Sequence, residues 1–297
     1  MHVFVTGATG LIGRSLCEAL RRRGDEVTAL TRQPGAALPA GVKPVQGDPA
    51  QDGPWVEALG RADAVVHLAG EPVAGGRWTP ERKARLASSR LDSTRRVAEA
   101  VAAGGPTVLV QGSAVGFYGD RGDELLDERA APGQGFLADL SVRWEAAAAP
   151  AAARARVVVV RTGLVLARDG GALPALARPF RLFAGGPLGD GRAWQPWIHL
   201  ADELGLLLLA LDDARARGPL NAVAPVPVRQ AELARTLATV LHRPALFPVP
   251  GVALRLAVGE MADVLLASQR VVPSQAIGLG YRYQFPTLEP ALRDLLG

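Results

Sequence analysis

The chain alternates short apolar runs with longer segments in which apolar residues recur every three or four positions. The short runs are typical of buried strands, and the longer segments of amphipathic helices. Their alternation predicts a parallel sheet with crossover helices. The predicted strands are residues 3–5, 27–31, 42–46, 64–68, 107–111, 157–160 and 220–223. The predicted helices are residues 11–23, 55–59, 80–103, 136–149, 173–183, 202–213 and 230–241.

Three glycines follow the first predicted strand at intervals of three, just before the first helical pattern. In a strand, turn and helix of this kind, Gly7, Gly10 and Gly13 would let backbone N–H groups and the helix dipole bind a pyrophosphate. An ordinary tight turn is the alternative. The position of these glycines at the start of an alternating chain favours dinucleotide binding.

The end of the second strand indicates which dinucleotide is bound. Folds that prefer NAD usually carry an acidic residue about 20 positions beyond the glycines, whereas an Arg there suits the 2′-phosphate of NADP. This chain has Arg32 at that place, and Asp25 and Glu26 precede the strand instead. The pattern therefore favours NADP(H), with an ordinary surface role for Arg32 as the alternative.

The other candidate cofactor contacts follow from sheet geometry, because ligands lie beyond the carboxyl ends of strands in open α/β sheets. The full predicted set is Gly7, Thr9, Gly10, Leu11, Ile12, Gly13, Arg32, Asp48, Leu68, Ala69, Gly70 and Thr162.

This order of elements predicts an α/β fold of the Rossmann type, a doubly wound parallel sheet with a smaller C-terminal substrate or lid subdomain. Residues 1–165 would form the NADP-binding core. Residues 166–240 would combine a substrate loop with a strand and helices that return to the core. Residues 241–297 would form the small helical subdomain.

Two hydroxyl side chains follow the fifth strand and are the candidate catalytic residues. Tyr118 would donate a proton, and Ser113 would hydrogen-bond the reacting oxygen. The alternatives are that Tyr118 packs with its hydroxyl satisfied and that Ser113 caps a turn. The candidate substrate contacts are Arg77, Trp78, Trp194 and Trp197, with core packing as the alternative for the last two.

Composition narrows the class of protein. The formal net charge of the 297 residues is only +4, and the strongest basic run, residues 21–23, lies in the last turn of a helix, so no nucleic-acid partner is expected. The single cysteine, Cys17, fits a reducing compartment, and no apolar run is long enough to span a bilayer. We therefore expect a cytoplasmic protein without a membrane partner. The four histidines fall at unrelated spacings, so no metal site is expected.

The predicted helix 80–103 carries many basic residues. They would form a solvated face, or part of the helix would contact a second subunit in a homodimer. These residues are Arg82, Lys83, Arg85, Arg90, Arg95 and Arg96.

Several motifs occur in order along the chain after the glycine turn. They lie at residues 67–72, 78, 113–119, 144–145, 197–199 and 243–261. In these motifs the sequence resembles the extended short-chain dehydrogenase/reductase superfamily, and more closely its atypical "epimerase family" proteins, which are related to NAD-dependent epimerase/dehydratases. The resemblance covers essentially the whole chain, including that family's C-terminal domain of unknown function. It implies a nicotinamide dinucleotide on a Rossmann-type fold.

The chain departs from the superfamily at its catalytic pair. The superfamily places Tyr-x-x-x-Lys on the helix after the fifth strand, but alignment on Glu145 puts Leu137 and Ser141 at those two positions. The resemblance thus leaves two hypotheses. One is an NADP(H)-dependent oxidoreductase or nucleotide-sugar-epimerase-like enzyme that acts on a small carbonyl or hydroxyl substrate. The other is a non-catalytic NADP(H)-binding redox or metabolite sensor.

Overall fold

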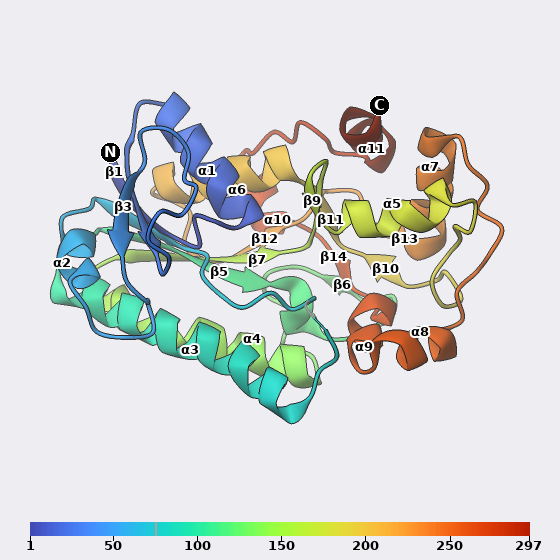
Figure 1. The fold of residues 1–297 in the computed structure, drawn as a ribbon, viewed down its shortest axis with the longest axis horizontal. Helices are drawn as coiled ribbons and strands as arrows, with labels where there is room; N and C mark the ends of the chain where they lie inside the picture. The colour runs from blue at the N-terminus through green and yellow to red at the C-terminus, as the bar shows by residue number, and fades with distance from the viewer. Residues whose placement is uncertain (75) are drawn as a thin grey trace.

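A seven-stranded sheet runs through the computed structural model, which describes residues 1–74 and 76–297 (Figure 1). The strand order is β12-β7-β5-β4-β1-β2-β3, and every neighbouring pair is parallel. This order confirms the doubly wound α/β fold. The strands are β1 (His2–Thr6), β2 (Glu26–Thr31), β3 (Lys43–Gln46), β4 (Ala64–His67), β5 (Val108–Ala114), β7 (Arg156–Thr162) and β12 (Gly218–Ala222).

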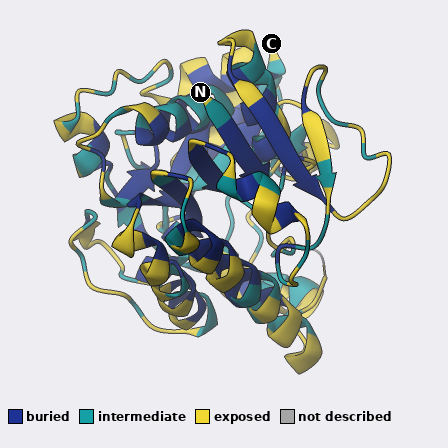
Figure 2. Cartoon of the chain, turned by 90° about the vertical axis from the view of Figure 1, so that its left-hand side faces the viewer, coloured by how far each residue is buried: buried dark blue, intermediate teal, exposed yellow. Residues whose placement is uncertain are grey.

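Helices cover both faces of the sheet. In Figure 1, α1 (Leu11–Arg22) and α6 (Leu200–Asp212) lie above it, and α2 (Trp55–Gly60), α3 (Pro80–Ala103) and α4 (Phe136–Ala147) lie below it. Figure 2 shows largely buried strands between helices whose outward faces are exposed. Strands buried on both faces explain the nearly continuous apolar runs in the sequence.

Successive residues of one strand pack against the helices on opposite faces of the sheet. Val3 and Val5 pack with the apolar faces of α1 and α6, whereas Phe4 packs with Trp55 and Leu59 of α2 on the opposite face. A shift of register by one residue would exchange these faces. The pairing of the strands is therefore fixed by burial on both sides.

The second half of the chain builds a smaller, separate core beside the sheet, called the second core below. Its elements surround Trp197, with α5, α7 and α11 visible on the right of Figure 1. They are β8 (Leu164–Ala167), β9 (Gly170–Gly171), α5 (Leu173–Arg181), β10 (Trp194–Gln195), β11 (Trp197–His199), β13 (Val228–Arg229), α7 (Gln230–Leu241) and α11 (Leu288–Leu296).

Short elements complete the chain. They are two 3-10 helices at Val115–Tyr118 and Ala149–Ala153, β6 (Leu125–Leu126), α8 (Gly251–Val258), α9 (Met261–Leu266), β14 (Arg270–Val271) and α10 (Ser274–Gly278). Within the described residues, no helix combines the length and apolar character needed to cross a bilayer.

The structure divides the C-terminal region differently from the predicted subdomain at 241–297. Only α8 and α9 stand at the periphery of the fold (Figure 1). After them, β14 pairs with β6, α10 packs against β12, and α11 packs against α7. Residues 270–297 therefore pack onto the main body, because Ala276 joins the core between the sheet and α6, and the apolar side chains of α11 complete the second core.

We predict that Gly13→Ala destabilises the fold. A Cβ at this position would overlap the carbonyl oxygen of Gly7, and the turn between β1 and α1 would have to move. Overpacking of this kind costs about 1–3 kcal/mol, measurable by urea unfolding. Gly278→Ala is the matched control, because a Cβ there meets nothing within 4 Å. Equal stability of the two variants would contradict the role assigned to Gly13.

Candidate functional site

The glycine turn fits closely against the loop that follows β4. Gly7 has a φ of +73°, and a Cβ on it would lie 2.7 Å from the carbonyl carbon of Leu68 and 2.9 Å from the amide nitrogen of Ala69. Only glycine meets both the dihedral and the close approach. The structure thus brings the predicted residues Gly7, Leu68, Ala69 and Gly70 together at the carboxyl ends of β1 and β4.

The N-terminus of α1 is open at this place. Gly10 is its N-cap and supplies no side-chain cap, and no acidic residue lies in its first turn. Thr9 and Gly10 are exposed, and Leu11 and Ile12 are half-buried beside them. The unpaired N–H groups and the positive end of the helix dipole fit a pyrophosphate, so the residues present suit a dinucleotide.

A buried histidine holds the loop after β4 in place. The Nδ1 atom of His67 lies 2.6 Å from the Thr6 hydroxyl, which also accepts a hydrogen bond from the Ala69 N–H at 3.2 Å. Its Nε2 lies 3.2 Å from the Ser93 hydroxyl, which donates to the Ser89 carbonyl, so Nε2 carries the hydrogen. Complete burial lowers the pKa of His67 to about 3, and the ring is neutral.

The remaining predicted cofactor residues lie along the same edge of the sheet. Arg32 is exposed just after β2, and Asp48 lies just after β3, where one carboxylate oxygen accepts from the Ala50 N–H at 2.9 Å. Thr162 ends β7, and its hydroxyl donates to a carboxyl oxygen of Glu203 at 2.8 Å. Both side chains therefore use part of their hydrogen-bonding capacity within the protein. Asp48 accepts from the Ala50 N–H, and Thr162 donates to Glu203.

Ser113 lies at the carboxyl end of β5 and is anchored by an ion pair. Its hydroxyl donates to Glu145 Oε1 at 2.7 Å, and Arg161 binds both carboxylate oxygens of Glu145 at 2.9 Å. Burial alone would lower the pKa of Arg161, but the bonds to Glu145 raise it. This bidentate pair fixes the position of the predicted catalytic serine.

Tyr118 is not placed for proton donation, and the structure contradicts that prediction. The side chain is 0% exposed, and its hydroxyl donates to Asn221 Oδ1 at 2.7 Å and accepts from Arg161 at 3.0 Å. Burial raises its pKa. Because a 3-10 helix at Val115–Tyr118 turns the ring inward after β5, Tyr118 is a core residue.

Trp197 also belongs to the core. It is 1% exposed and packs with Leu166, Leu173 and Phe180, so the prediction that it contacts substrate is wrong. Its position in the short buried strand β11 explains this, since β11 pairs with β8 inside the second core.

Of the other three predicted substrate contacts, Arg77 and Trp194 bond to the region of α8 and α9, whereas Trp78 packs against α4. The Arg77 guanidinium donates to the Leu256 carbonyl of α8, and Trp78 packs edge-on against Phe136. Trp194 is half-buried, and its backbone N–H donates to Ser268 at 3.1 Å, just after α9. The peripheral helices thus connect two loops that the sequence analysis grouped only by residue type.

Glu203 is a buried carboxyl group that the sequence analysis missed. It is fully buried in α6, Thr162 bonds one of its oxygens, and the other has no hydrogen-bond partner among the described residues. Burial raises its pKa to about 8. An acidic residue in the first turn of a helix normally complements the dipole at the surface, so local pattern does not indicate that Glu203 is buried.

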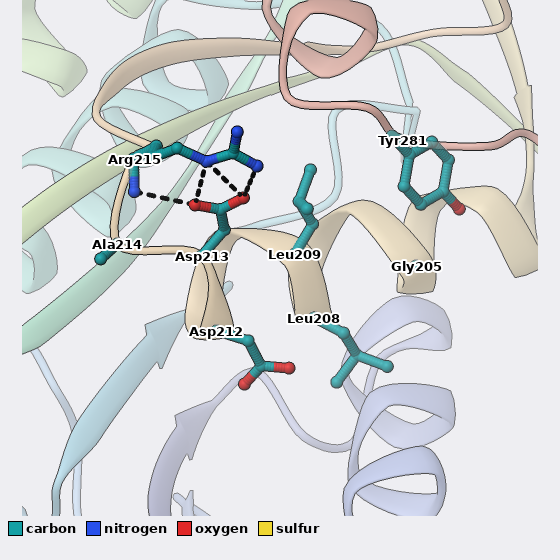
Figure 3. Close-up of a pocket in the computed structure, with 8 residues that line it drawn as sticks. All are labelled: Gly205, Leu208, Leu209, Asp212, Asp213, Ala214, Arg215 and Tyr281. Carbon is teal, nitrogen blue, oxygen red and sulfur yellow. Dashed lines mark hydrogen bonds and ion pairs between the residues drawn. The ribbon is translucent and has the colours of Figure 1, made fainter.

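A pocket lies at the other end of α6, lined by Leu208, Leu209, Asp213, Arg215 and Tyr281 among others (Figure 3). Asp213 and Arg215 satisfy each other within it through several hydrogen bonds. This end of α6 leads into β12, so it faces the amino ends of the strands. The pocket is therefore remote from the glycine turn and Ser113.

Comparison with known proteins places this site in a family. Residues 3–222 match the model of the NAD dependent epimerase/dehydratase family, and residues 249–295 match a domain of unknown function. The chain therefore belongs to the NAD-dependent epimerase/dehydratase family, as an extended short-chain dehydrogenase/reductase. Two similar relatives are the epimerase family protein SDR39U1 of Homo sapiens, at 37% identity over the whole of both chains, and its chloroplastic homolog of Arabidopsis thaliana. The latter is 39% identical over 100% of this chain and 87% of that protein.

Two solved structures are similar over nearly all of this chain. Human SDR39U1, crystallised with NADPH, has a TM-score of 0.89 at 36% identity, covering 99% of both chains. A nucleoside-diphosphate sugar epimerase from Corynebacterium glutamicum has a TM-score of 0.81 at 37% identity, covering 99% of this chain and 58% of that one. More distant UDP-sugar epimerases, at 16 to 19% identity, share the fold.

We predict that Tyr118→Phe lowers stability but leaves cofactor binding and any turnover intact. The variant removes a buried hydroxyl that bonds Asn221 and Arg161, at a cost of about 1–3 kcal/mol in the free energy of unfolding. Chemical denaturation measures the loss. Abolished turnover with full NADPH binding would return the proton-donor role to Tyr118.

Glu203 predicts a dependence of stability on pH. Its folded pKa of about 8 lies above the ordinary pKa of 4.5 for a glutamate, so the folded state retains a proton that the unfolded state loses. Its contribution to stability therefore falls as pH rises from 4.5 to about 8, by at most about 1.4 kcal/mol per pH unit. Glu203→Gln should remove this fall. Urea unfolding at pH 5 and pH 8 compares the two proteins, and parallel pH profiles would contradict the assignment.

Proposed function

We propose that this protein binds NADP(H) and acts as an oxidoreductase or nucleotide-sugar-epimerase-like enzyme on a small carbonyl or hydroxyl substrate. The observation that carries the proposal is the contact of Gly7 with Leu68 and Ala69 beside the uncapped N-terminus of α1. The human relative crystallised with NADPH supports the choice of cofactor. Exposed Arg32 after β2 supports it independently, because a guanidinium suits a 2′-phosphate.

The chain's own residues would orient the cofactor and the reacting oxygen. When bound, the nicotinamide supplies or accepts the hydride. Ser113 is the catalytic candidate that the geometry favours, because it lies at the carboxyl end of β5 and Glu145 fixes its hydroxyl. Leu137 and Ser141 stand where the superfamily's Tyr and Lys would be. Groups other than the usual Tyr and Lys must therefore donate and accept the proton.

A non-catalytic NADP(H) sensor is the second candidate. The burial of Tyr118 favours it, because the one tyrosine near β5 is removed from the crevice. The two candidates differ in turnover. A sensor holds NADPH without consuming it, whereas an enzyme oxidises NADPH when it is offered a suitable carbonyl.

We propose three further properties that the sequence leads us to expect. A homodimer would form through α3, which light scattering of the purified protein tests, and the location would be cytoplasmic, which fractionation of cells tests. The unknown substrate is proposed to be a small molecule rather than a nucleic acid or a membrane.

Cofactor choice gives the direct test. We expect fluorescence titration to show tighter binding of NADPH than of NADH, and Arg32→Asp to reverse or abolish the preference by removing the cation and repelling the 2′-phosphate. Arg95→Asp, an exposed charge change on α3, is the control. An unchanged affinity ratio would remove Arg32 from the site, and absence of NADPH binding by the wild-type protein would refute the proposed function. NADPH oxidation across a carbonyl and sugar-nucleotide panel then separates enzyme from sensor.

A further inference from the structure

Arg90 differs from the other basic residues of α3. The expectation that these residues form a solvated face is wrong for Arg90, which is only 9% exposed. Each of the other five lies within 4 Å of an acidic side chain, including Arg82, whose own side chain is only 12% exposed. The pairs are Arg82 and Arg85 with Glu71, Lys83 with Glu260, Arg95 with Asp92, and Arg96 with Asp52 and Glu99.

The guanidinium of Arg90 has little polar compensation for its burial. Its one hydrogen bond within the described residues is from Nη1 to the Leu86 carbonyl at 3.2 Å, and no acidic side chain there forms an ion pair with it. Its Cζ lies 5.0 Å from the centre of the Trp144 ring. Burial lowers the pKa of Arg90, and the charge of Glu71 offsets this only in part. A cation held in this way is suited to bind an anion.

Two contacts place this cation beside the candidate site. A Cβ on Gly70, in the loop after β4, would lie 3.3 Å from Cζ of Arg90. Trp144, which Arg90 stacks on, directly precedes the Glu145 that anchors Ser113. Arg90 therefore lies between the loop proposed to hold the cofactor and the helix that positions the candidate catalytic serine. Gly70 is exposed, and a side chain on it would crowd the guanidinium, so the glycine keeps the space over Arg90 clear of side-chain atoms.

We propose that Arg90 binds a carboxylate or phosphate group of the substrate and so selects anionic carbonyl or hydroxyl compounds. This inference rests on the proposed function, because it places the anion beside the bound dinucleotide. The planar guanidinium fits the two oxygens of a carboxylate or phosphate, and the low exposure of the site strengthens each charged hydrogen bond.

The test uses NADPH-loaded protein with malonate and inorganic phosphate as probes, each titrated by calorimetry. We expect saturable binding of at least one probe to the wild-type protein. Arg90→Gln should weaken that binding about tenfold or more, as expected for loss of a charged hydrogen bond, and should retain NADPH. Arg95→Gln, an exposed arginine on the same helix, is the matched control and should bind as wild type does. Arg90→Lys keeps the charge and should bind with intermediate affinity.

Several outcomes would overturn the proposal. They are absence of binding of either probe to the wild-type protein, equal binding by Arg90→Gln, and equal weakening by Arg95→Gln. Competition of the probes with NADPH, together with loss of NADPH by Arg90→Gln, would assign the cation to the cofactor instead. If Arg90→Gln does not fold, binding by Arg90→Lys at wild-type affinity would also count against recognition by the guanidinium fork. Failure of the wild-type protein to bind NADPH is a separate result, which refutes the proposed function, and the probe titration of the unloaded protein still tests Arg90.

Discussion

The approach of Gly7 to Leu68 and Ala69 is the constraint on which the site depends. The turn after β1 packs on the loop after β4 at a separation that leaves no room for a Cβ atom, so only glycine fits. The hydrogen bonds of Thr6 and His67 hold the same loop from beneath. The turn after β1 and the loop after β4 are thereby packed together at one edge of the sheet, and the exposed N-terminus of α1 lies beside them. In the proposed function, this packing of backbone segments would orient a dinucleotide more than any single side chain does.

The carboxyl ends of the strands divide into two chemical environments. Near β1 and β4 the polar groups are backbone amides and a neutral histidine, which suit a phosphate-bearing cofactor. Near β5 and β7 they are a buried ion pair and a serine, and Arg90 lies between the two groups. This division supports a site in which the cofactor and an anionic substrate have separate polar partners.

Local pattern was sufficient to predict the fold and to bring together the residues of the candidate cofactor site. Apolar runs and glycine spacing depend on neighbours in sequence, and they predicted the seven main strands and the grouping of Gly7 with Leu68 to Gly70. The errors concern side chains whose surroundings come from distant segments. Tyr118 bonds Asn221, and Trp197 packs against α5. The position of Tyr118 after a strand and the pairing of Trp197 with Trp194 in sequence therefore do not indicate that these side chains are buried. Arg90 is hidden by Trp144 of another helix.

The position of α11 has a consequence for biosynthesis. Leu288, Leu292 and Leu295 close the second core around Trp197, and they follow every strand of the main sheet along the chain. The main sheet can pair once β12 has emerged from the ribosome, whereas the second core stays open until α11 has emerged as well. During that interval the nascent chain exposes an apolar surface that a chaperone would recognise, and a ribosome stalled between β12 and α11 would hold a chain with that surface uncovered.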